Sequence, residues 1–179
     1  MKVTAGLAEH DQEIEQLFTA TFTASEGAAE GTLIGGLVRN LLADTSSEDI
    51  RVFCAENDRR IIGAAIFTRL TYPEDPHIVF LLSPMAVARD CQHQGIGQAL
   101  LRHSLAALRA EGVQVAMTYG DPEFYGRVGF QAVTEDQARA PLPLSQPHGW
   151  IGQSLTEHEM PALQGPSFCV SALNRSDVW

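Results

Sequence analysis

The stretch Gln92-His93-Gln94-Gly95-Ile96-Gly97 decides the fold of this 179-residue chain. It follows a continuously apolar run, which predicts a buried strand, and it opens a helical stripe made by Ile96, Leu100, Leu101, Leu105 and Leu108. Gly95 and Gly97 allow the main chain to turn so that successive N–H groups converge on an anion. The helix N-terminus adds roughly half a positive charge, so the stretch predicts a site for a pyrophosphate.

The segments on either side of this loop predict a mixed sheet. Val113 to Thr118 reads as a strand, and it follows a helix that Gly112 ends. A strand, a helix of this length and a second strand require parallel pairing with a right-handed crossover. Upstream, apolar runs at Arg51 to Glu56 and Arg60 to Leu70 flank the turn Asn57-Asp58-Arg59, which indicates an antiparallel hairpin.

The rest of the chain adds elements to the same sheet. They are a strand at residues 2 to 7, helices at Glu9 to Ala24 and Leu33 to Leu42, a central strand at Ile78 to Ala88 and an edge strand at Phe168 to Leu173. No repeat or linker divides the chain. We therefore expect residues 1–179 to form a single α/β domain with a mixed central β-sheet flanked by helices.

Composition excludes several functions. The net charge of -10 without a basic run argues against a nucleic-acid partner. No run of 18 apolar residues and no signal-peptide core is present, so we expect neither membrane insertion nor secretion. Cys54, Cys91 and Cys169 form no C-x-x-C pair, which favours reduced thiols and a cytoplasmic location. The six histidines, including His93 and His103, show no metal-ligand spacing, so no metal is expected.

Three classes of ligand could occupy the glycine loop. A P-loop nucleotide site needs Gly-Lys-Ser/Thr, whereas Gln98 and Ala99 follow Gly97 here, so that class is excluded. A dinucleotide fold needs a third glycine or alanine where this chain has Leu100, although Asp121 could imitate its ribose-binding acid. Coenzyme A is the third class.

Two motifs resemble one family. Gln92, Gly95 and Gly97 match the Gln-x-x-Gly-x-Gly signature of the GNAT acetyltransferase superfamily. The segments Gly120-Asp121-Pro122 and Phe124 to Phe130 are similar to a motif of a bacterial branch of that superfamily, the YhbS-like proteins. The resemblance implies a GNAT-like domain with a parallel β-loop-α-β acetyl-CoA-binding core. It also implies an N-acetyltransferase that uses acetyl-CoA as co-substrate and needs no metal.

The resemblance also assigns roles to residues. The main chain of six residues is expected to hold the pyrophosphate of the cofactor: Gln92, His93, Gln94, Gly95, Ile96 and Gly97. The strand at Val87 and Ala88 is expected to pair with the pantetheine arm. Tyr125 is expected near the thioester sulfur, where its phenol can protonate the departing thiolate.

The sequence leaves the general base and the acceptor open. Relatives often use a strand glutamate as the base, but the comparable stretch Phe80 to Met85 offers only Ser83. His77, Glu26 and Asp121 are candidates, and Cys91 has no histidine and acid placed to activate it as a nucleophile. The alternative function is a non-catalytic acyl-CoA-binding module. The acceptor could be a small-molecule or protein amine, and family members often form dimers, so a homodimer is compatible with the resemblance.

Overall fold

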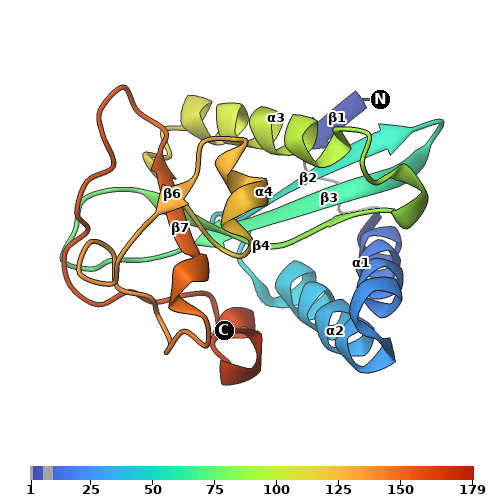
Figure 1. Cartoon of the computed structure of the whole chain (residues 1–179), viewed down its shortest axis with the longest axis horizontal. Helices are drawn as coiled ribbons and strands as arrows, with labels where there is room; N and C mark the ends of the chain where they lie inside the picture. Colours follow the sequence, from blue (N-terminus) through green and yellow to red (C-terminus); the bar gives the residue numbers. More distant parts are fainter. Residues whose placement is uncertain (1, 6–9) are drawn as a thin grey trace. The chain divides into compact units, whose positions relative to one another are not determined.

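The structure is a computed structural model that describes residues 2–5 and 10–179. Seven strands lie in one sheet in the order β1-β2-β3-β4-β5-β7-β6 (Figure 1). The strands are β1 Lys2–Ala5, β2 Ile50–Asn57, β3 Arg60–Arg69, β4 Val79–Val87, β5 Val115–Tyr119, β6 Gln131–Ala132 and β7 Trp150–Ser154. The α-helices are α1 Asp11–Glu26, α2 Ala28–Asp44, α3 Ile96–Ala110 and α4 Pro122–Gly126. Short 3-10 turns are η2 Arg89–Cys91, η3 Pro147–Gly149, η4 Ser171–Leu173 and η5 Ser176–Val178.

Strand directions confirm the predicted mixed α/β sheet. β1 runs antiparallel to β2, and β5 runs antiparallel to β7. β4 and β5 are parallel, with a register that begins at Val79 and Val115 and ends at Leu82 and Thr118. The parallel pair therefore brackets the glycine loop and α3, as the strand-loop-helix-strand order predicted.

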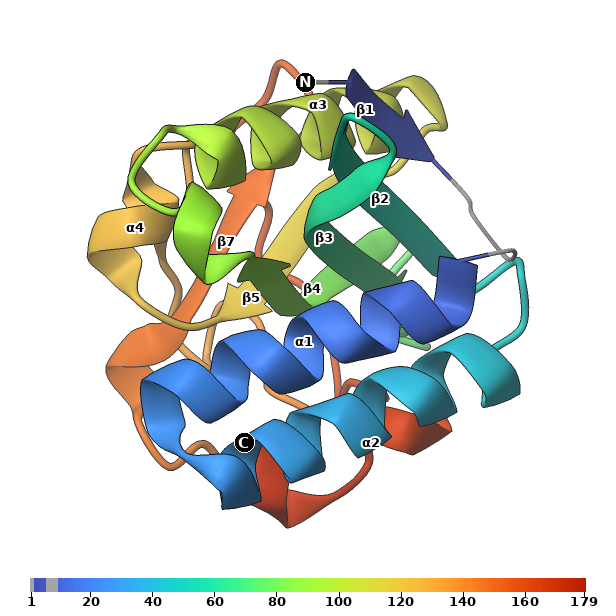
Figure 2. The same cartoon turned by 90° about the vertical axis from the view of Figure 1, so that its right-hand side faces the viewer.

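Two compact units make up the chain. The first comprises Met1–Phe67 with Pro84–Ser104, and the second comprises Thr68–Ser83 with Leu105–Trp179. In the first unit, α1 and α2 lie side by side on one face of β2 and β3, and the beginning of α3 lies on the opposite face (Figures 1 and 2). α2 approaches α1 closely at two glycines, because a Cβ at Gly31 or Gly35 would collide with Thr23 or Thr19.

The hairpin predicted between β2 and β3 is present. Its two turn residues, Asp58 and Arg59, both have positive φ angles, of 49° and 66°. Two central residues with positive φ are the mark of a type I′ turn, whose twist matches that of the flanking strands. This turn brings Arg60, the first residue of β3, to the end of the hairpin.

The second unit contains one element that differs from the prediction. The run Phe168 to Leu173 is not an edge strand: only Phe168 pairs, in an isolated bridge with Thr71, and residues 171–173 form η4. Pro166 lacks an N–H for a ladder, and the Phe168 side chain is 57% exposed, so the run has neither the pairing nor the burial of a strand. Strands β6 and β7 and helix α4 were not predicted, and α4 packs next to β6 (Figure 1).

Most predicted ends of elements lie close to the observed ones, but α2 begins at Ala28, five residues before the predicted start at Leu33. The first turn of α2 holds small residues that give no apolar pattern, and Gly31 packs against Thr23 of α1.

The first strand and the first helix were expected to include residues 6 and 7 and Glu9, which lie outside the described residues. Gly112 ends α3 as expected, with a φ of 88° and a Val113 N–H that donates to the Leu108 carbonyl at 3.0 Å.

Candidate active site

Val87, the last residue of β4, and Ala88, which follows it, present main-chain hydrogen-bonding groups on the two opposite edges of the strand. The Ala88 N–H donates to the Ile62 carbonyl of β3 at 2.8 Å. Main-chain groups of successive strand residues point to alternate sides, so the Val87 N–H faces away from β3. The Val87 carbonyl accepts a hydrogen bond from Gln92 Nε2 at 3.0 Å. Val87 and Ala88 were both expected to pair with the pantetheine arm. The Val87 N–H lies on the edge away from β3, whereas the Ala88 N–H is already bonded to β3.

The glycine loop, residues 92–97, reverses the chain between β4 and α3. His93 and Gly95 both have left-handed backbone conformations, with φ angles of 59° and 77°. A Cβ at Gly95 would have no heavy atom within 4 Å, so glycine is needed here for its backbone conformation rather than for space within the chain. Gln94 Nε2 donates to the Asp90 carbonyl at 3.2 Å and ties the loop to the preceding turn.

The loop ends on the N-terminus of α3. The first helical hydrogen bond that closes this turn runs from the Ala99 N–H to the Gly95 carbonyl at 3.0 Å. The N–H groups of Ile96, Gly97 and Gln98 come before it and have no acceptor inside the helix. These N–H groups lie at the N-terminus of α3, which is the positive end of the helix dipole, so this end of the helix can bind an anion. Gly97 is buried at this position.

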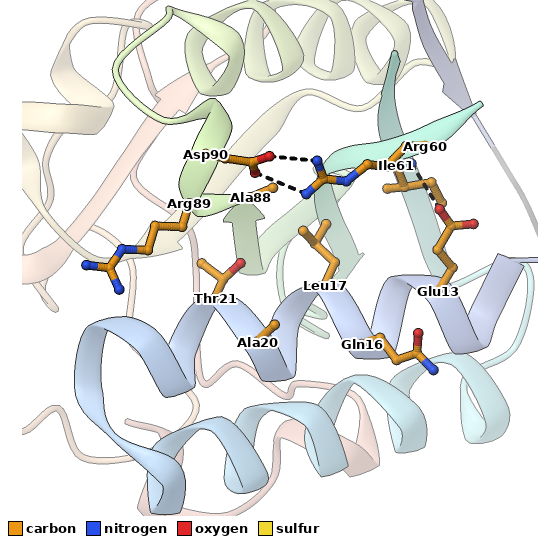
Figure 3. A pocket seen from close by; sticks show the side chains of 10 residues that line it. All are labelled: Glu13, Gln16, Leu17, Ala20, Thr21, Arg60, Ile61, Ala88, Arg89 and Asp90. Atoms are coloured by element: carbon orange, nitrogen blue, oxygen red, sulfur yellow. Dashed lines mark hydrogen bonds and ion pairs between the residues drawn. The ribbon is translucent and has the colours of Figure 1, made fainter. Parts of the chain in front are cut away.

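An open cavity of about 540 Å³ lies beside the turn that precedes the loop (Figure 3). Several of its polar groups are engaged with one another: Arg60 donates to the two oxygens of Asp90 at 2.7 and 3.0 Å, and Glu13 accepts from a main-chain N–H of β3 at 3.0 Å. The hydrogen bonds and charge of Arg60 lower the pKa of Asp90. Arg89 extends away from that pair (Figure 3). Its guanidinium makes no hydrogen bond or ion pair with another described residue, so it can receive an anion.

Tyr125 lies in the second unit, on α4, directly after β5. Asp121 caps α4 because its Oδ1 accepts from the Glu123 N–H at 2.9 Å, and Pro122 occupies the first helical position. The helix is short, and the Val128 and Phe130 N–H groups donate to the Tyr125 carbonyl at 3.0 and 3.3 Å. These bonds close the turn after α4 and hold the main chain at Tyr125.

The Tyr125 ring is held by its neighbours. It packs edge to face against Phe124 and Phe130, with ring centroids 5.0 and 5.7 Å apart. Burial raises the pKa of Tyr125 to about 12, opposed by a hydrogen bond between its hydroxyl and the Thr118 side chain and reinforced by the charge of Asp121. The phenol is therefore protonated throughout the neutral range and can act as a proton donor.

His77 forms a tight pair with an acid. Its Nδ1 lies 2.6 Å from Asp75 Oδ1, and the Asp75 side chain is only 3% exposed. Asp75 also accepts from the main-chain N–H groups of His77 and Gln164, both at 2.9 Å. Burial acts to raise the pKa of Asp75, but these hydrogen bonds and the nearby imidazole outweigh it and lower the pKa. The pair fastens the loop before β4 to the C-terminal segment.

The position of His77 separates it from Tyr125 within the second unit. His77 precedes Ile78, whose carbonyl accepts from Gln114 just before β5 begins, whereas Tyr125 follows the end of β5. The five residues of β5 span about 17 Å. His77 and Tyr125 therefore lie at opposite ends of this strand, and one substrate amine cannot contact both.

The other candidates from the sequence have different surroundings. Glu26 is the last residue of α1 and is exposed, and Ser83 lies within β4 and is partly exposed. Asp121 is exposed, with one oxygen used as the helix cap. Cys91 ends η2 as a free, partly exposed cysteine next to the glycine loop.

A cavity that the sequence did not predict adjoins the Tyr125 helix. It has a volume of about 410 Å³ and lies between residues 119–122 and residues 145–149, which include His148. The pairing of Tyr119 with Trp150 at the start of β7 brings the two segments together. A histidine between a proline and a glycine, at 147–149, was the one local signal that this stretch offered.

Comparison with known proteins identifies the family. The acetyltransferase (GNAT) domain family matches residues 48–132, which include the glycine loop and Tyr125. The chain is 33% identical over 126 residues to the uncharacterized N-acetyltransferase YjhQ of Escherichia coli K12, and the match covers 68% of this chain and 70% of YjhQ. The chain therefore belongs to the GNAT family of N-acetyltransferases and is an acyltransferase by class.

Solved structures confirm the fold. The GNAT N-acetyltransferase YhbS from Escherichia coli, in complex with CoA, matches with a TM-score of 0.83 and 20% identity, over 98% of this chain and 92% of YhbS. A GNAT acetyltransferase from Brucella melitensis, in complex with acetyl-CoA, matches with a TM-score of 0.74 and 23% identity, over 96% of each chain. The predicted membership of the GNAT superfamily is confirmed by the family and sequence matches, and the match to YhbS shows that the chain has the same fold.

None of the described helices is long and apolar enough to cross a membrane. Among residues 2–5 and 10–179, no three His, Cys, Asp or Glu side chains are grouped so that they could hold a metal ion.

Proposed function

We propose that this chain transfers the acetyl group of acetyl-CoA to a primary amine. One observation carries the proposal: the glycine loop ends on the first turn of α3, where three main-chain N–H groups have no acceptor inside the helix. Membership of the GNAT family supports the same ligand, because YhbS and the Brucella protein were solved with CoA and acetyl-CoA.

The pyrophosphate of the cofactor would lie against the main chain of residues 92–97. The N–H groups there supply hydrogen bonds and the α3 dipole supplies positive potential, which together favour a doubly charged group. Arg89 would add a full positive charge close to the loop, which matters in a chain of net charge -10. The pantetheine arm would pair with the Val87 N–H as an added strand, and Ala88 would contribute its side chain or carbonyl.

The reaction needs two proton transfers. An alkylammonium has a pKa of about 10.4 and must lose a proton before its nitrogen can attack the thioester carbon. The new C–N bond forms as the carbonyl becomes an oxyanion, and the C–S bond then breaks. Burial keeps the phenol of Tyr125 protonated at neutral pH. Its hydroxyl protonates the departing thiolate and then recovers a proton from solvent.

Residues 1–179 would act as one GNAT domain in this reaction, which the match to YhbS over nearly the whole chain supports. The alternative is a module that binds acyl-CoA without turnover. Calorimetry with acetyl-CoA, CoA and NAD tests the choice of cofactor. Release of free thiol from acetyl-CoA in the presence of primary amines, with mass detection of the acetylated product, separates an enzyme from a binding module. Acetyl-CoA binding without thiol release from any amine would leave the binding module as the function.

A further inference from the structure

The cavity between residues 119–122 and 145–149 is held open by a fixed loop. The Tyr119 hydroxyl accepts from the Gln146 N–H at 2.6 Å and shares a hydrogen bond with Ser145 Oγ at 2.9 Å. The Tyr119 ring stacks on Trp179 with centroids 6.1 Å apart. The loop that carries His148 is therefore anchored at its beginning by side-chain and main-chain contacts to β5.

A second anchor joins this loop to the residues that contact Tyr125. The Gly120 N–H donates to the Gly149 carbonyl at 3.0 Å. A Cβ at Gly120 would lie 2.7 Å from Tyr125 Cε2, so the Tyr125 ring packs directly against Gly120. Gly120 thus contacts Tyr125 and also lines the cavity.

Tyr119 and Tyr125 lie on different faces of β5. Side chains of successive strand residues alternate, so Tyr119 points to the face opposite Thr118. Tyr119 lines the cavity, whereas Thr118 hydrogen-bonds to Tyr125. The cavity and Tyr125, the proposed proton donor to the thioester sulfur, therefore adjoin the same end of β5 within the second unit.

Two side chains in the cavity have unused polar atoms. His148 is exposed, and its imidazole has no hydrogen bond or ion pair with another described residue. Asp121 lines the cavity and uses Oδ1 to cap α4, and its second oxygen has no hydrogen bond to another described residue. An imidazole accepts protons near neutral pH, and a carboxylate attracts an ammonium.

We propose that this cavity binds the acceptor as a small aliphatic ammonium, with Asp121 attracting its charge and His148 accepting the proton that it loses. The inference rests on the proposed function. The amine released by His148 attacks the thioester carbon, the thiolate takes a proton from Tyr125, and a second proton leaves the nitrogen for solvent. One alkylammonium and one acetyl-CoA therefore give one amide, one CoA thiol and one proton.

The cavity also restricts the acceptor. A volume of about 410 Å³ suits a small molecule rather than a folded protein surface. Asp121 would repel a carboxylate next to the reacting amine, so amino acids with a free α-carboxylate should be poor acceptors. Butylamine, 1,4-diaminobutane, spermidine and tyramine are therefore suitable probes, with glycine as the disfavoured probe.

His148→Gln is the first test, with His158→Gln as the matched control. His158 is exposed in the same unit and does not line this cavity. We expect His148→Gln to lower kcat/KM for alkylamine probes by about 10² or more, because general-base help has that magnitude. The defect should shrink to less than about tenfold with benzoic hydrazide, whose weakly basic amine is uncharged at neutral pH. A merely structural role of His148 would give equal defects with both kinds of acceptor.

Asp121→Asn is the second test, with Glu123→Gln as the matched control for charge. An asparagine can still cap α4, so the helix should persist while the charge is lost. We expect KM for 1,4-diaminobutane to rise about tenfold with kcat within a few fold, and Glu123→Gln to change neither. An equal effect of both substitutions would indicate general surface charge and overturn the role of Asp121.

The outcomes separate this inference from the proposed function. A parent chain that does not bind acetyl-CoA contradicts the proposed function itself. A parent chain that binds acetyl-CoA but acetylates none of the amine probes overturns the acceptor assignment alone. Full activity of folded His148→Gln with alkylamines, across pH 6 to 9, would overturn the role of His148.

Discussion

The Tyr125 ring occupies the space that a side chain at Gly120 would need, because a Cβ there would lie 2.7 Å from Tyr125 Cε2. Gly120→Ala should displace the ring and its hydroxyl, lower the free energy of unfolding by about 1–3 kcal/mol and lower kcat by about tenfold or more. Denaturant unfolding and initial rates measure both effects. Gly126→Ala is the control, since a Cβ there meets no heavy atom within 4 Å. Equal rates in both variants would mean that the position of Tyr125 does not matter.

The hydroxyl of Tyr125 can be tested apart from its ring. Tyr125→Phe keeps the packing against Phe124 and Phe130, so acetyl-CoA affinity should stay within a few fold while kcat falls at least about tenfold. Steady-state rates and calorimetry make the comparison. An unchanged kcat, with the chemical step shown to limit the rate, would reduce Tyr125 to a structural aromatic.

The raised pKa of Tyr125 also predicts a pH range. The folded chain binds this proton more tightly than the unfolded chain, so the stability it contributes is fully present below the unfolded pKa of about 10. That contribution is lost as the pH rises from there through the folded value of about 12. The kcat of the parent chain should therefore show no basic decline due to Tyr125 below about pH 10. A decline near neutral pH that Tyr125→Phe abolishes would contradict this assignment.

Substitutions of Gly95 can separate the effect of its left-handed backbone conformation from the effect of adding a side chain where the phosphate would lie. Gly95→Ala places a side chain at a φ of 77° and should cost about 1–2 kcal/mol of stability. Gly95→Asn should fold better than Gly95→Ala, because asparagine tolerates this conformation. Both variants should bind acetyl-CoA more weakly than the parent, since each puts a Cβ where the phosphate must approach the main chain. If the asparagine variant binds as tightly as the parent, phosphate does not approach at Gly95.

The pair of Asp75 and His77 is predicted to support the structure and not the reaction. Asp75→Ala removes the acceptor of three hydrogen bonds at a nearly buried site and should cost about 2–3 kcal/mol of stability. Because the pKa of Asp75 is lowered in the folded chain, the contribution of this carboxylate is lost as the pH falls through that lowered value. His77→Gln should leave kcat within a few fold, in contrast to His148→Gln. A large loss of kcat at unchanged stability would make His77 part of the reaction.

The glycine loop and the hairpin turn could be predicted because each is a local pattern. The loop follows an apolar strand and opens an amphipathic helix, and the hairpin turn at residues 57–59 is marked by its own residues. Most element ends fell close to the observed ones for the same reason, whereas the start of α2 at Ala28 was missed because the small residues there give no apolar pattern. The main-chain hydrogen bond of Ala88 to Ile62 could not be predicted, because it depends on how two strands pair in space.

The C-terminal third was predicted poorly because its structure depends on distant partners. β7 contains Gly152, which interrupts the apolar pattern and is required because a Cβ there would lie 2.5 Å from the Met117 sulfur. The cavity at His148 forms only when β7 pairs with β5, between residues that are 31 positions apart at Tyr119 and Trp150 and 39 apart at Val115 and Ser154. The run at Phe168 has strand-like composition, but no neighbouring strand pairs along its length.

The central claim is tested most directly by calorimetric titration of acetyl-CoA into three proteins: the parent chain, Gly97→Asp and Gly36→Asp. Gly97 is buried in the first turn of α3, whereas a Cβ at Gly36 on α2 meets no heavy atom within 4 Å. Gln94→Glu adds a charge on the exposed part of the loop and serves if Gly97→Asp does not fold. We predict that the parent and Gly36→Asp bind acetyl-CoA, that Gly97→Asp loses binding and that Gln94→Glu weakens it at least about tenfold. Binding as tight as that of the parent in a folded Gly97→Asp, or in Gln94→Glu, would contradict the claim that the cofactor phosphates lie at residues 92–97.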